Sequence, residues 1–487
     1  MTRAAIPANT RLVAEECGVA GIWTPPDVLS AEPARLAFFA LYALQHRGQE
    51  SAGLAAGDGV RVRVIKRMGL VGQAFAEPDL EELVGNVAMG HTRYSTTGSS
   101  RIENAQPMVV HDPALGSLAV GHNGNLINAR ELREELAERG ALFDTSSDTE
   151  VLLKVIEHAP GMSWDERIRN ALPRLQGAWS LVFMSARAIY AARDPLGVRP
   201  LVLGRRGAAH VVASETCALE TIGAEFVREV QPGEVLRLDG EGVTIVDETA
   251  GERRALCVFE YVYLASASSR LGGISMYAAR ERMGEILASE HPAAGDVVIP
   301  VPDSAIPSAI GFARRAALPF REGLIKNRYI GRTFIQPSQQ LREHNVALKY
   351  NTLAEVLDGK RVVVVDDSIV RGSTSGPIVK LLRHAGATEV HMRICSPPIQ
   401  HPCYFGVDMA RRAELIAAHK SVEEIREHIG ADSLGYLSLE GLVRATGGTS
   451  NDFCSACFTG DYPIPIQLEL DKSSLELDQR RSPVRTG

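Results

Sequence analysis

Two adjacent carboxylates and a loop of small polar residues follow an apolar run in VVVVDDSIVRGSTS, residues 362–375. The β-branched run predicts a buried parallel strand, and ligands bind beyond the carboxyl ends of such strands. Backbone N–H groups in the loop and at the start of the next helix favour phosphate. Asp366 and Asp367 would repel that anion unless they held Mg²⁺ or sugar hydroxyls. The pattern therefore predicts a site for a phosphorylated sugar with its metal ion.

Taken alone, two aspartates would more simply end a buried strand in a solvated acidic turn. The rest of the stretch argues against that interpretation, because a cation, a glycine and several hydroxyl groups follow at once. We expect the ligand to contact Asp366, Asp367, Ser368, Arg371, Gly372, Ser373 and Thr374. A dinucleotide site is the weaker interpretation, since no G-x-G-x-x-G sequence follows a strand here.

A second loop, VPDSAIPSAIG at 301–311, also runs from a predicted strand to a predicted helix. We expect it to hold a diphosphate group, with Ser304 near the metal ion. Residues 326–351, between the two loops, carry Lys326, Arg328, Arg332, Arg342 and Lys349. These cations fit an ordinary solvated loop, or a lid that clamps diphosphate and excludes water from an activated ribosyl centre. In the second interpretation, Arg332 and Lys349 bind the ligand.

Cys17 stands directly before a predicted strand in EECGVAGIW. If the chain is cut after Glu16, the free α-amine of Cys17, with a pKa of about 7.7–8.0, becomes a base for its own thiol. Alone, a cysteine at this place is more simply a small core residue, and an Asn-Gly pair is usually a turn. The combination matters here, because the chain also carries Arg93 in HTRYSTTG, Asn123 and Gly124 in GHNGNL, and Asp148 in SSDTE.

These residues have the chemistry that hydrolysis of an amide needs. Arg93 can favour the thiolate and hold a substrate carboxylate through two hydrogen bonds. The side-chain amide of Asn123 and the N–H of Gly124 can stabilise an oxyanion. Asp148 can bind the α-amine of a substrate. Together with Cys17, they predict a thiol-dependent site for an amino acid amide.

The chain has seven cysteines: Cys17, Cys217, Cys257, Cys395, Cys403, Cys454 and Cys457. Their odd number does not predict a disulfide framework, and no secretory signal precedes Cys17, so we expect a cytoplasmic chain with reduced thiols. Cys454-x-x-Cys457 is a chelating pair that could serve zinc, redox chemistry or packing. Cys257, Cys395 and Cys403 are the candidates for two further ligands.

Two different element patterns position these residues. From Cys17 to about residue 248, short strands cluster around Gly-rich turns, as at 18–23, 115–124, 179–184 and 234–238, and helical spacing occurs at 34–48 and 148–159. This half is α+β. From residue 249 the pattern is α/β, with strands at 296–302, 361–367 and 389–396 and a helix at 376–386. It predicts a parallel sheet with right-handed crossovers.

Length and composition agree with two domains of similar size. We expect a leader at 1–16, domains at 17–248 and 249–466, and a mobile tail at 467–487. The hydrophobic fraction of 45% and the charged fraction of 23% are those of a globular protein. The net charge of −7 does not favour a nucleic-acid partner, and no apolar stretch is long enough to span a membrane.

Residues 17–215 resemble the N-terminal-nucleophile glutamine amidotransferases. The resemblance rests on CGVAGI, QHRGQESAG, HTRYSTTG, GHNGNL, SSDTE, ARDPLGVRPL and SETCALE, which occur in this order. It implies an αββα sandwich that releases ammonia from glutamine. By the resemblance, Cys17 is the nucleophile, Asn123 and Gly124 form the oxyanion hole, and Arg93 and Asp148 hold glutamine. Because other members begin the mature chain with the nucleophile, residues 1–16 are expected to be a propeptide.

The 362–375 stretch resembles the motif by which type I phosphoribosyltransferases bind phosphoribosyl pyrophosphate (PRPP). With both domains in this order, residues 17–465 resemble the amidophosphoribosyltransferase family, which carries out the first committed step of purine synthesis. The resemblance implies that glutamine, PRPP and water give 5-phosphoribosylamine, glutamate and diphosphate. It further implies Mg²⁺ at Ser304, Asp366 and Asp367, an internal ammonia channel, feedback inhibition by purine nucleotides, and a homotetramer or homodimer.

One subgroup of this family carries both a cleaved propeptide and a [4Fe–4S] cluster on four cysteines. The chain is similar to that subgroup at Cys257, Cys403, Cys454 and Cys457. The resemblance leaves Cys395 and Cys217 as packing residues, although Cys395 could replace Cys403 and zinc stays an alternative. Cysteine-free relatives catalyse the same reaction, which implies a structural or oxygen-sensing role for the cluster.

Two other hypotheses stay open at this point. Another N-terminal-nucleophile amidotransferase, such as one that aminates a sugar phosphate, would not need the 362–375 loop. A PRPP-sensing regulator without catalysis would have no reason to keep Cys17, Arg93, Asn123 and Asp148 together.

Overall fold

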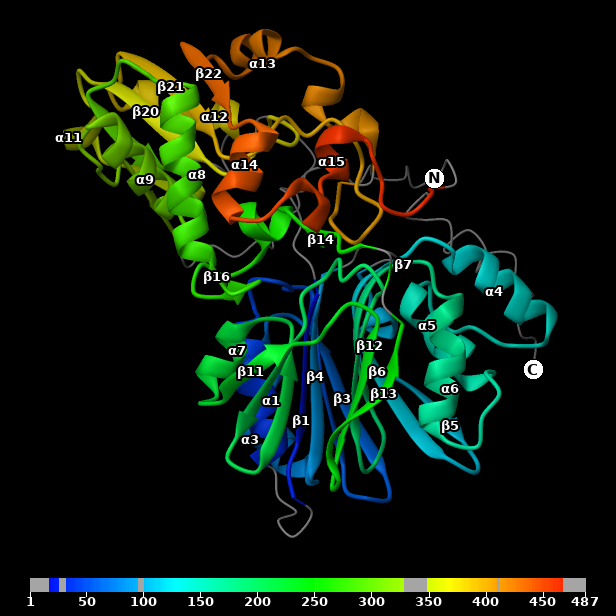
Figure 1. The fold of residues 1–487 in the computed structure, drawn as a ribbon. Coiled ribbons are helices and arrows are strands. Elements are labelled where there is room, and N and C mark those ends of the chain that lie inside the picture. The colour runs from blue at the N-terminus through cyan, green and yellow to red at the C-terminus, as the bar shows by residue number, and fades with distance from the viewer. Residues whose placement is uncertain are drawn as a thin grey trace, which may run out of the picture.

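The computed structural model describes residues 17–25, 32–94, 100–249, 251, 253–327, 348–409 and 411–466. Figure 1 shows two halves in contact, with the earlier residues forming the lower half and the later residues the upper half. No helix in these ranges combines the length and the apolar character that a membrane crossing needs.

The first half contains two antiparallel sheets. The seven-stranded sheet has the order β11-β9-β10-β1-β4-β2-β3. Its strands are β1 (Gly18–Trp23), β2 (Ser51–Gly57), β3 (Val62–Met68), β4 (Val87–Arg93), β9 (Val202–Arg206), β10 (Ala209–Ala213) and β11 (Glu225–Glu229). The six-stranded sheet has the order β13-β12-β8-β7-β6-β5. Its strands are β5 (Met108–Asp112), β6 (Gly116–Leu126), β7 (Gly177–Met184), β8 (Ile189–Arg193), β12 (Glu234–Asp239) and β13 (Gly242–Glu248).

Helices cover the outer face of each sheet. Over the seven-stranded sheet lie α1 (Glu32–Ala43), α2 (Val71–Ala74), α3 (Glu77–Glu82) and α7 (Thr216–Thr221). The other sheet is covered by α4 (Ala129–Glu138), α5 (Asp148–Glu157) and α6 (Trp164–Ala171), with short 3₁₀ turns η1 (Ile102–Asn104) and η2 (Leu172–Arg174) nearby in the chain. Side chains of both sheets, among them Val19, Met89 and Val182, form the layer between them. This arrangement confirms the predicted αββα sandwich.

A parallel sheet organises the second half. Its order is β17-β20-β21-β22, with β17 (Val297–Pro300), β20 (Arg361–Asp366), β21 (Glu389–Ile394) and β22 (Ser433–Tyr436). Val363 and Val365 pack on the face of α8 (Met276–Glu290) and α9 (Ile306–Ala316). Val362 and Val364 pack on the opposite face, against α12 (Ser375–His384) and α13 (Val422–Ile429). The continuous valine run is therefore buried on both faces, as a central parallel strand requires.

Smaller elements complete this half and join it to the first. They are β14 (Leu256–Cys257), the π-helical turn η3 (Glu260–Leu264), β15 (Arg270–Leu271), β16 (Ile274–Ser275), β18 (Leu324–Lys326), β19 (Tyr350–Thr352), α11 (Ala354–Leu357), η4 (Arg412–Glu414), η5 (Ile416–Ala418), α14 (Leu439–Thr446), η6 (Ser450–Asp452), β23 (Phe453–Cys454) and α15 (Ala456–Thr459). The N–H of Cys257 donates to the carbonyl of Val198, so β14 is attached to the first half.

The predicted strands all occur, and the main difference concerns a helix. The helical spacing at 34–48 predicted a longer α1, whereas this helix ends at Ala43. The following residues form a turn in which the N–H of Arg47 donates to the carbonyl of Leu44 at 2.9 Å. The spacing of apolar residues could not reveal where α1 ends, because the turn after the helix carries a buried charged residue.

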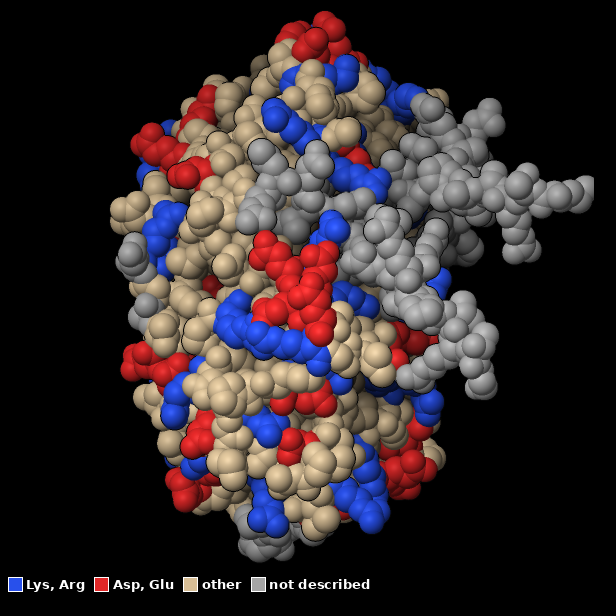
Figure 2. Space-filling view, turned by 90° about the vertical axis from the view of Figure 1, so that its right-hand side faces the viewer, with Lys and Arg blue, Asp and Glu red and all other residues tan. Residues whose placement is uncertain are grey.

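Charged residues of both signs are mixed on the face in Figure 2. On α4, for example, Arg130 pairs with Glu134, and Glu135 pairs with both Arg139 and Arg174. Such exposed pairs contribute little to stability. This face therefore carries no single sign of charge that would attract a phosphorylated molecule.

Candidate functional site

Cys17 lies at the start of β1, where the strand pairs with the end of β4. Gly18 is opposite Thr92 in this register, so Cys17 and Arg93 come close. The Cys17 side chain is 5% exposed, and its thiol donates to the carbonyl of Tyr94 at 3.4 Å. Burial raises the pKa of the thiol to about 11, although the charge of Arg93 opposes this rise. The thiol is therefore protonated near neutral pH.

Arg93 and Asp148 bring opposite charges to this thiol, and both act on its pKa. Arg93 is 2% exposed, and its Nη1 lies 3.5 Å from Oε2 of Glu50. Asp148 is the first residue of α5, where a carboxylate is favoured by the helix dipole. Its Oδ2 accepts a hydrogen bond from the N–H of Leu126 at 3.0 Å. The two residues can thus face the two charged ends of an amino acid.

Asn123 and Gly124 lie side by side in β6. Asn123 is fully buried, and neither atom of its amide group has a hydrogen-bond partner among the described residues. A buried amide without a partner is costly, which makes it a candidate for binding a ligand. Gly124 has φ +151°, and a Cβ there would lie 2.0 Å from the carbonyl oxygen of Ala178. Only glycine fits at this position.

Asp366 ends β20 and Asp367 follows it, next to the loop after β17. Ser304 donates to Oδ2 of Asp367 at 2.5 Å, and Ser368 donates to its Oδ1 at 2.6 Å. Burial raises the pKa of both carboxyls, and the charge of Asp367 raises that of Asp366 further. The described residues hold no group of three or more metal-binding side chains. Two carboxylates with a hydroxyl nevertheless match Mg²⁺, which takes few protein ligands and otherwise binds water and phosphate.

The rest of the predicted phosphate loop divides into two groups. Gly372 has φ +70° and Thr374 caps α12, so the loop leads directly into a helix N-terminus, with exposed Ser373 between them. Arg371 instead pairs with Glu414 at 2.5 Å. The charge of Lys349 acts on both aspartates. Arg332 and most of the predicted lid, residues 328–347, lie outside the described residues.

Four cysteines line one small pocket. Cys257 and Cys454 are opposite each other where β14 pairs with β23, and Cys403 and Cys457 also line the pocket, which is otherwise mostly apolar. All are free thiols. Burial raises the pKa of Cys257 to about 11 and that of Cys454 to about 12, and neighbouring cysteines contribute to both shifts. Four thiols are the donor set that a [4Fe–4S] cluster takes, although the described side chains as placed form no group of three or more that could hold a metal ion.

Cys395 does not line this pocket. It follows β21, and its N–H donates to the carbonyl of Asp366 at 2.9 Å. It is buried in the core of the second half. Cys217 lies on α7, with its sulfur 3.8 Å from Oε2 of Glu215. The geometry thus groups Cys403, rather than Cys395, with the other three.

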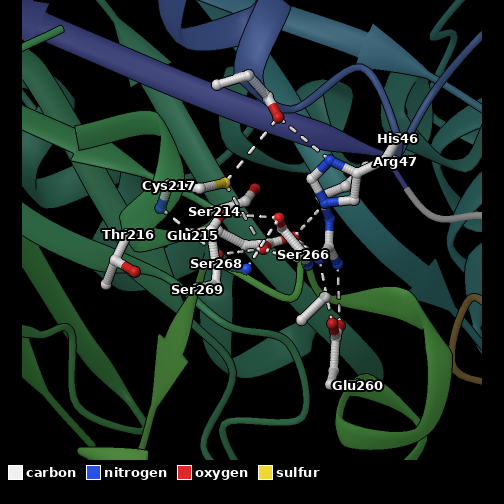
Figure 3. A network of polar contacts seen from close by, with 12 residues as sticks. His46, Arg47, Ser214, Glu215, Thr216, Cys217, Glu260, Ser266, Ser268 and Ser269 are labelled. Carbon is white, nitrogen blue, oxygen red and sulfur yellow. Dashed lines mark hydrogen bonds and ion pairs between the residues drawn. The ribbon is translucent and has the colours of Figure 1, made fainter. Parts of the chain in front are cut away.

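A buried network of charges beside Cys17 was missed by the sequence analysis. Figure 3 shows Arg47 between Glu215 and Glu260, with His46 and several serines around them. Arg47 belongs to QHRGQESAG and Glu215 to SETCALE, two stretches used only as family motifs. Charged residues normally predict solvent exposure, so only the fold reveals that these are buried.

Comparison with known proteins agrees with this two-part arrangement. A glutamine amidotransferase domain model matches residues 91–221, and a phosphoribosyl transferase domain model matches residues 275–395. The chain is 50% identical to the amidophosphoribosyltransferase of Synechococcus elongatus over 470 residues, which cover 95% of this chain and 94% of the relative. It is 47% identical to that of Bacillus subtilis over 456 residues, which cover 93% and 95%.

Two solved structures have the same fold throughout. One is described as the allosteric regulatory enzyme of purine biosynthesis, with a TM-score of 0.88, 46% identity, and coverage of 93% of this chain and 97% of the other. The second is the Bacillus subtilis glutamine PRPP amidotransferase complexed with ADP and GMP, with a TM-score of 0.87, 46% identity and coverage of 93% and 98%. Fold and sites therefore define a two-domain glutamine amidotransferase with a phosphoribosyltransferase half. Within that class, the chain belongs to the amidophosphoribosyltransferase family.

Proposed function

We propose that this chain makes 5-phosphoribosylamine by two half-reactions, one in each half of the molecule. Glutamine, PRPP and water are converted into 5-phosphoribosylamine, glutamate and diphosphate, as the first committed step of purine biosynthesis. The observation that carries this proposal is the presence, in one chain, of the Cys17 site and the Asp366–Asp367 loop on the two domains of this family. Neither alternative hypothesis accounts for both sites.

The first half-reaction releases ammonia at Cys17. After removal of residues 1–16, the α-amine of Cys17 takes the thiol proton, and the sulfur attacks the side-chain amide carbon of glutamine. Arg93 holds the substrate carboxylate and Asp148 its α-amine. Hydrogen bonds from the Asn123 amide and the Gly124 N–H stabilise the oxyanion. When the C–N bond breaks, ammonia leaves with the proton that the α-ammonium returns.

Water then completes this half-reaction. It adds to the thioester while the α-amine of Cys17 takes one of its protons. The C–S bond breaks, glutamate is released, and the proton returns to the sulfur. The partnerless Asn123 amide supports the oxyanion role, and the pKa of the buried thiol supports the need for a base in the mature chain.

The second half-reaction takes place beyond the carboxyl end of β20. The loop at 368–374 and the start of α12 bind the 5-phosphate of PRPP. Asp366 and Asp367 bind the ribose hydroxyls. Ammonia attacks C1, the bond from C1 to the diphosphate oxygen breaks, and the nitrogen loses one proton. Lys349 and Arg332 balance the charge of the leaving diphosphate, and closure of residues 326–351 excludes water and completes the ammonia channel.

Ser304, Asp366 and Asp367 would hold Mg²⁺. When bound, this ion neutralises part of the charge on the diphosphate. The hydroxyl of Ser304 supports this assignment, because it points at Oδ2 of Asp367 at 2.5 Å. Arg371 would first have to leave Glu414 in order to reach a phosphate.

Cys257, Cys403, Cys454 and Cys457 would hold a [4Fe–4S] cluster, which places the chain in the subgroup with a cleaved propeptide. Their common pocket supports this proposal. The cluster is assigned a structural or oxygen-sensing role, because the family resemblance includes cysteine-free relatives that catalyse the same reaction. Purine nucleotides are proposed as feedback inhibitors, a homotetramer or homodimer as the assembly, and the cytoplasm as the location.

A paired assay tests the two half-reactions together. The processed chain with glutamine, PRPP and Mg²⁺ should release glutamate and diphosphate in equal amounts. Omission of PRPP should strongly reduce glutamate release, because we expect glutamine hydrolysis to be coupled to the use of ammonia at the PRPP site. Glutamate formed at the same rate without PRPP would favour another amidotransferase. Tight PRPP binding without either product would favour a regulator.

A further inference from the structure

Arg47 connects the nucleophile to both halves of the molecule. It is 1% exposed, and its Nε donates to the backbone carbonyl of Cys17 at 3.1 Å. Its Nη1 donates to Glu215 at 2.5 Å, and Nη1 and Nη2 together bind the two carboxylate oxygens of Glu260 at 3.1 and 2.9 Å. Figure 3 shows this guanidinium between the two carboxylates. Its planar geometry therefore fixes Cys17 relative to Glu260.

Arg47 and Glu215 are charged although they are buried. Burial alone would lower the pKa of Arg47, but Glu260 and Glu215 raise it. Burial alone would raise the pKa of Glu215, but His46 and Arg47 lower it. Arg199 lies 3.5 Å from Glu260 and contributes a second cation. Buried ion groups of this kind gain little net stability, so a role in geometry is the better explanation for them.

Glu215 is held by residues of both halves other than Glu260. His46 contacts its Oε1 at 2.8 Å, and Ser269 donates to its Oε2 at 2.6 Å. The preceding residue, Ser214, accepts a hydrogen bond from the N–H of Val19 at 3.0 Å. When Glu260 is changed, Glu215 should therefore stay in position. It would still supply one counter-charge to Arg47.

Glu260 is held by the phosphoribosyltransferase half. It is the first residue of η3, the π-helical turn whose carbonyl groups bind the buried Arg280. Nε of Arg280 donates to Tyr261 at 2.9 Å, and Nη2 donates to Ala265 at 2.7 Å. Arg280 also interacts electrostatically with Asp367 of the PRPP site. One short segment thus lies between the two sites.

We propose that Glu260 is a positioning residue for the glutaminase: acting through Arg47, it holds the backbone of Cys17 in place from the phosphoribosyltransferase half. The proposal rests on the assigned role of Cys17 as nucleophile. The effect of Glu260 on Cys17 passes through the guanidinium of Arg47, and the contact of Glu260 with Arg199 lies outside that path. Loss of the Glu260 carboxylate would remove one of the two acidic partners that hold Arg47, so the guanidinium could rotate and release the Cys17 carbonyl.

The test compares glutamine-dependent and ammonia-dependent synthesis in the processed, full chain. Glu260→Gln should lower kcat with glutamine by about 10- to 100-fold, the scale of a misplaced reacting group. The KM for glutamine should change less than threefold, since Arg93 and Asp148 are untouched. Synthesis from ammonium should stay within about twofold. Glu234→Gln is the matched control, because Glu234 is also buried and binds Arg228 through two bonds at 2.7 and 2.6 Å.

A double-variant comparison separates positioning from general loss of structure. Arg47→Lys keeps the charge but loses the planar set of donors. If Glu260 acts through Arg47, Glu260→Gln should add little further loss in the Arg47→Lys background. Glu260→Asp, which keeps the charge but shortens the side chain, gives the same comparison if Glu260→Gln does not fold.

Two results would overturn the inference. One is a folded Glu260 variant with the wild-type ratio of glutamine to ammonia activity. The other is a fully additive loss in the double variant. A Cys17→Ala chain that still used glutamine would instead overturn the assignment of the nucleophile, so failure of the two proposals can be distinguished.

Discussion

At the scale of residues, the glutaminase site depends on a thiol that its surroundings hold protonated. Burial raises the pKa of Cys17 to about 11, and the nearby Asp148 and Glu50 work in the same direction. Arg93 opposes them only in part. The proposed cleavage after Glu16 would free an α-amine on Cys17, which supplies a base without another side chain.

The unprocessed chain should therefore be inactive as a glutaminase. At pH 8, about one thousandth of a thiol with a pKa of about 11 is ionised, and its alkylation should accelerate only as the pH rises toward that value. In the mature chain the base works in its neutral form, so glutaminase activity should rise through about pH 7.7–8.0. The intact mass shows whether residues 1–16 are still attached. The rate of alkylation by iodoacetamide at different pH values reports the ionisation of the thiol. An active chain that still carried residues 1–16 would contradict it.

Residue types alone predicted the candidate site only in part. Cys17, Arg93, Asn123 and Asp148 could be selected because each has a recognisable chemistry. Arg47, Glu215 and Glu260 could not, because their function depends on contacts between segments more than 160 residues apart in sequence. Nor could the sequence show that Arg371 is paired with Glu414.

At the scale of elements, α8 and α9 position the loop that carries Ser304. The two helices touch at their backbones, because a Cβ on Gly284 would lie 1.8 Å from the carbonyl of Ser308. A Cβ on Gly311 would likewise lie 1.9 Å from the carbonyl of Glu281. Since α9 begins at Ile306, its placement against α8 decides where Ser304 meets Asp367.

Gly284→Ala should separate these helices. We expect the free energy of unfolding to fall by about 1–3 kcal/mol, the cost of overpacking a close contact. Ammonia-dependent synthesis should fall as well, because the Ser304 loop moves with α9. Thermal unfolding and the ammonium assay measure both effects. Gly240→Ala is the control, since a Cβ there meets nothing within 4 Å, and equal behaviour of the two variants would argue against this account.

Strand positions were predictable because the valine run of β20 is continuous and the short strands of the first half lie between Gly-rich turns. The length of α1 was not, since its apolar spacing continues past Ala43 into the turn that carries Arg47. Tertiary contacts of one charged residue ended the helix earlier than local spacing indicates.

At the scale of the whole molecule, the cysteine pocket lies next to the contact between the halves. The side-chain amide of Asn125 donates to the carbonyl of Tyr404 at 2.9 Å, and Nε of Arg199 donates to Phe405 at 3.0 Å. Tyr404 directly follows Cys403 and Asn125 directly follows Gly124. The segment that carries one proposed cluster ligand is therefore attached to the strand that carries the oxyanion hole.

Protein purified without oxygen should contain about four iron and four sulfide ions per chain. Cys403→Ser should lose most of this iron, because Cys403 lines the pocket. Cys395→Ser should keep it, because Cys395 lies beside Asp366 instead. Metal and sulfide analysis, together with a visible absorption spectrum, measures the cluster content of each variant. One zinc ion without sulfide, or loss of iron only in Cys395→Ser, would contradict the assignment.

The central claim is that one half makes ammonia and the other uses it. Cys17→Ala, prepared as a processed chain, tests it most directly through diphosphate release from PRPP with either nitrogen source. We predict that synthesis from glutamine falls to background while synthesis from ammonium stays within about twofold of wild type. Retained use of glutamine, or loss of both activities in a folded chain, would contradict the account.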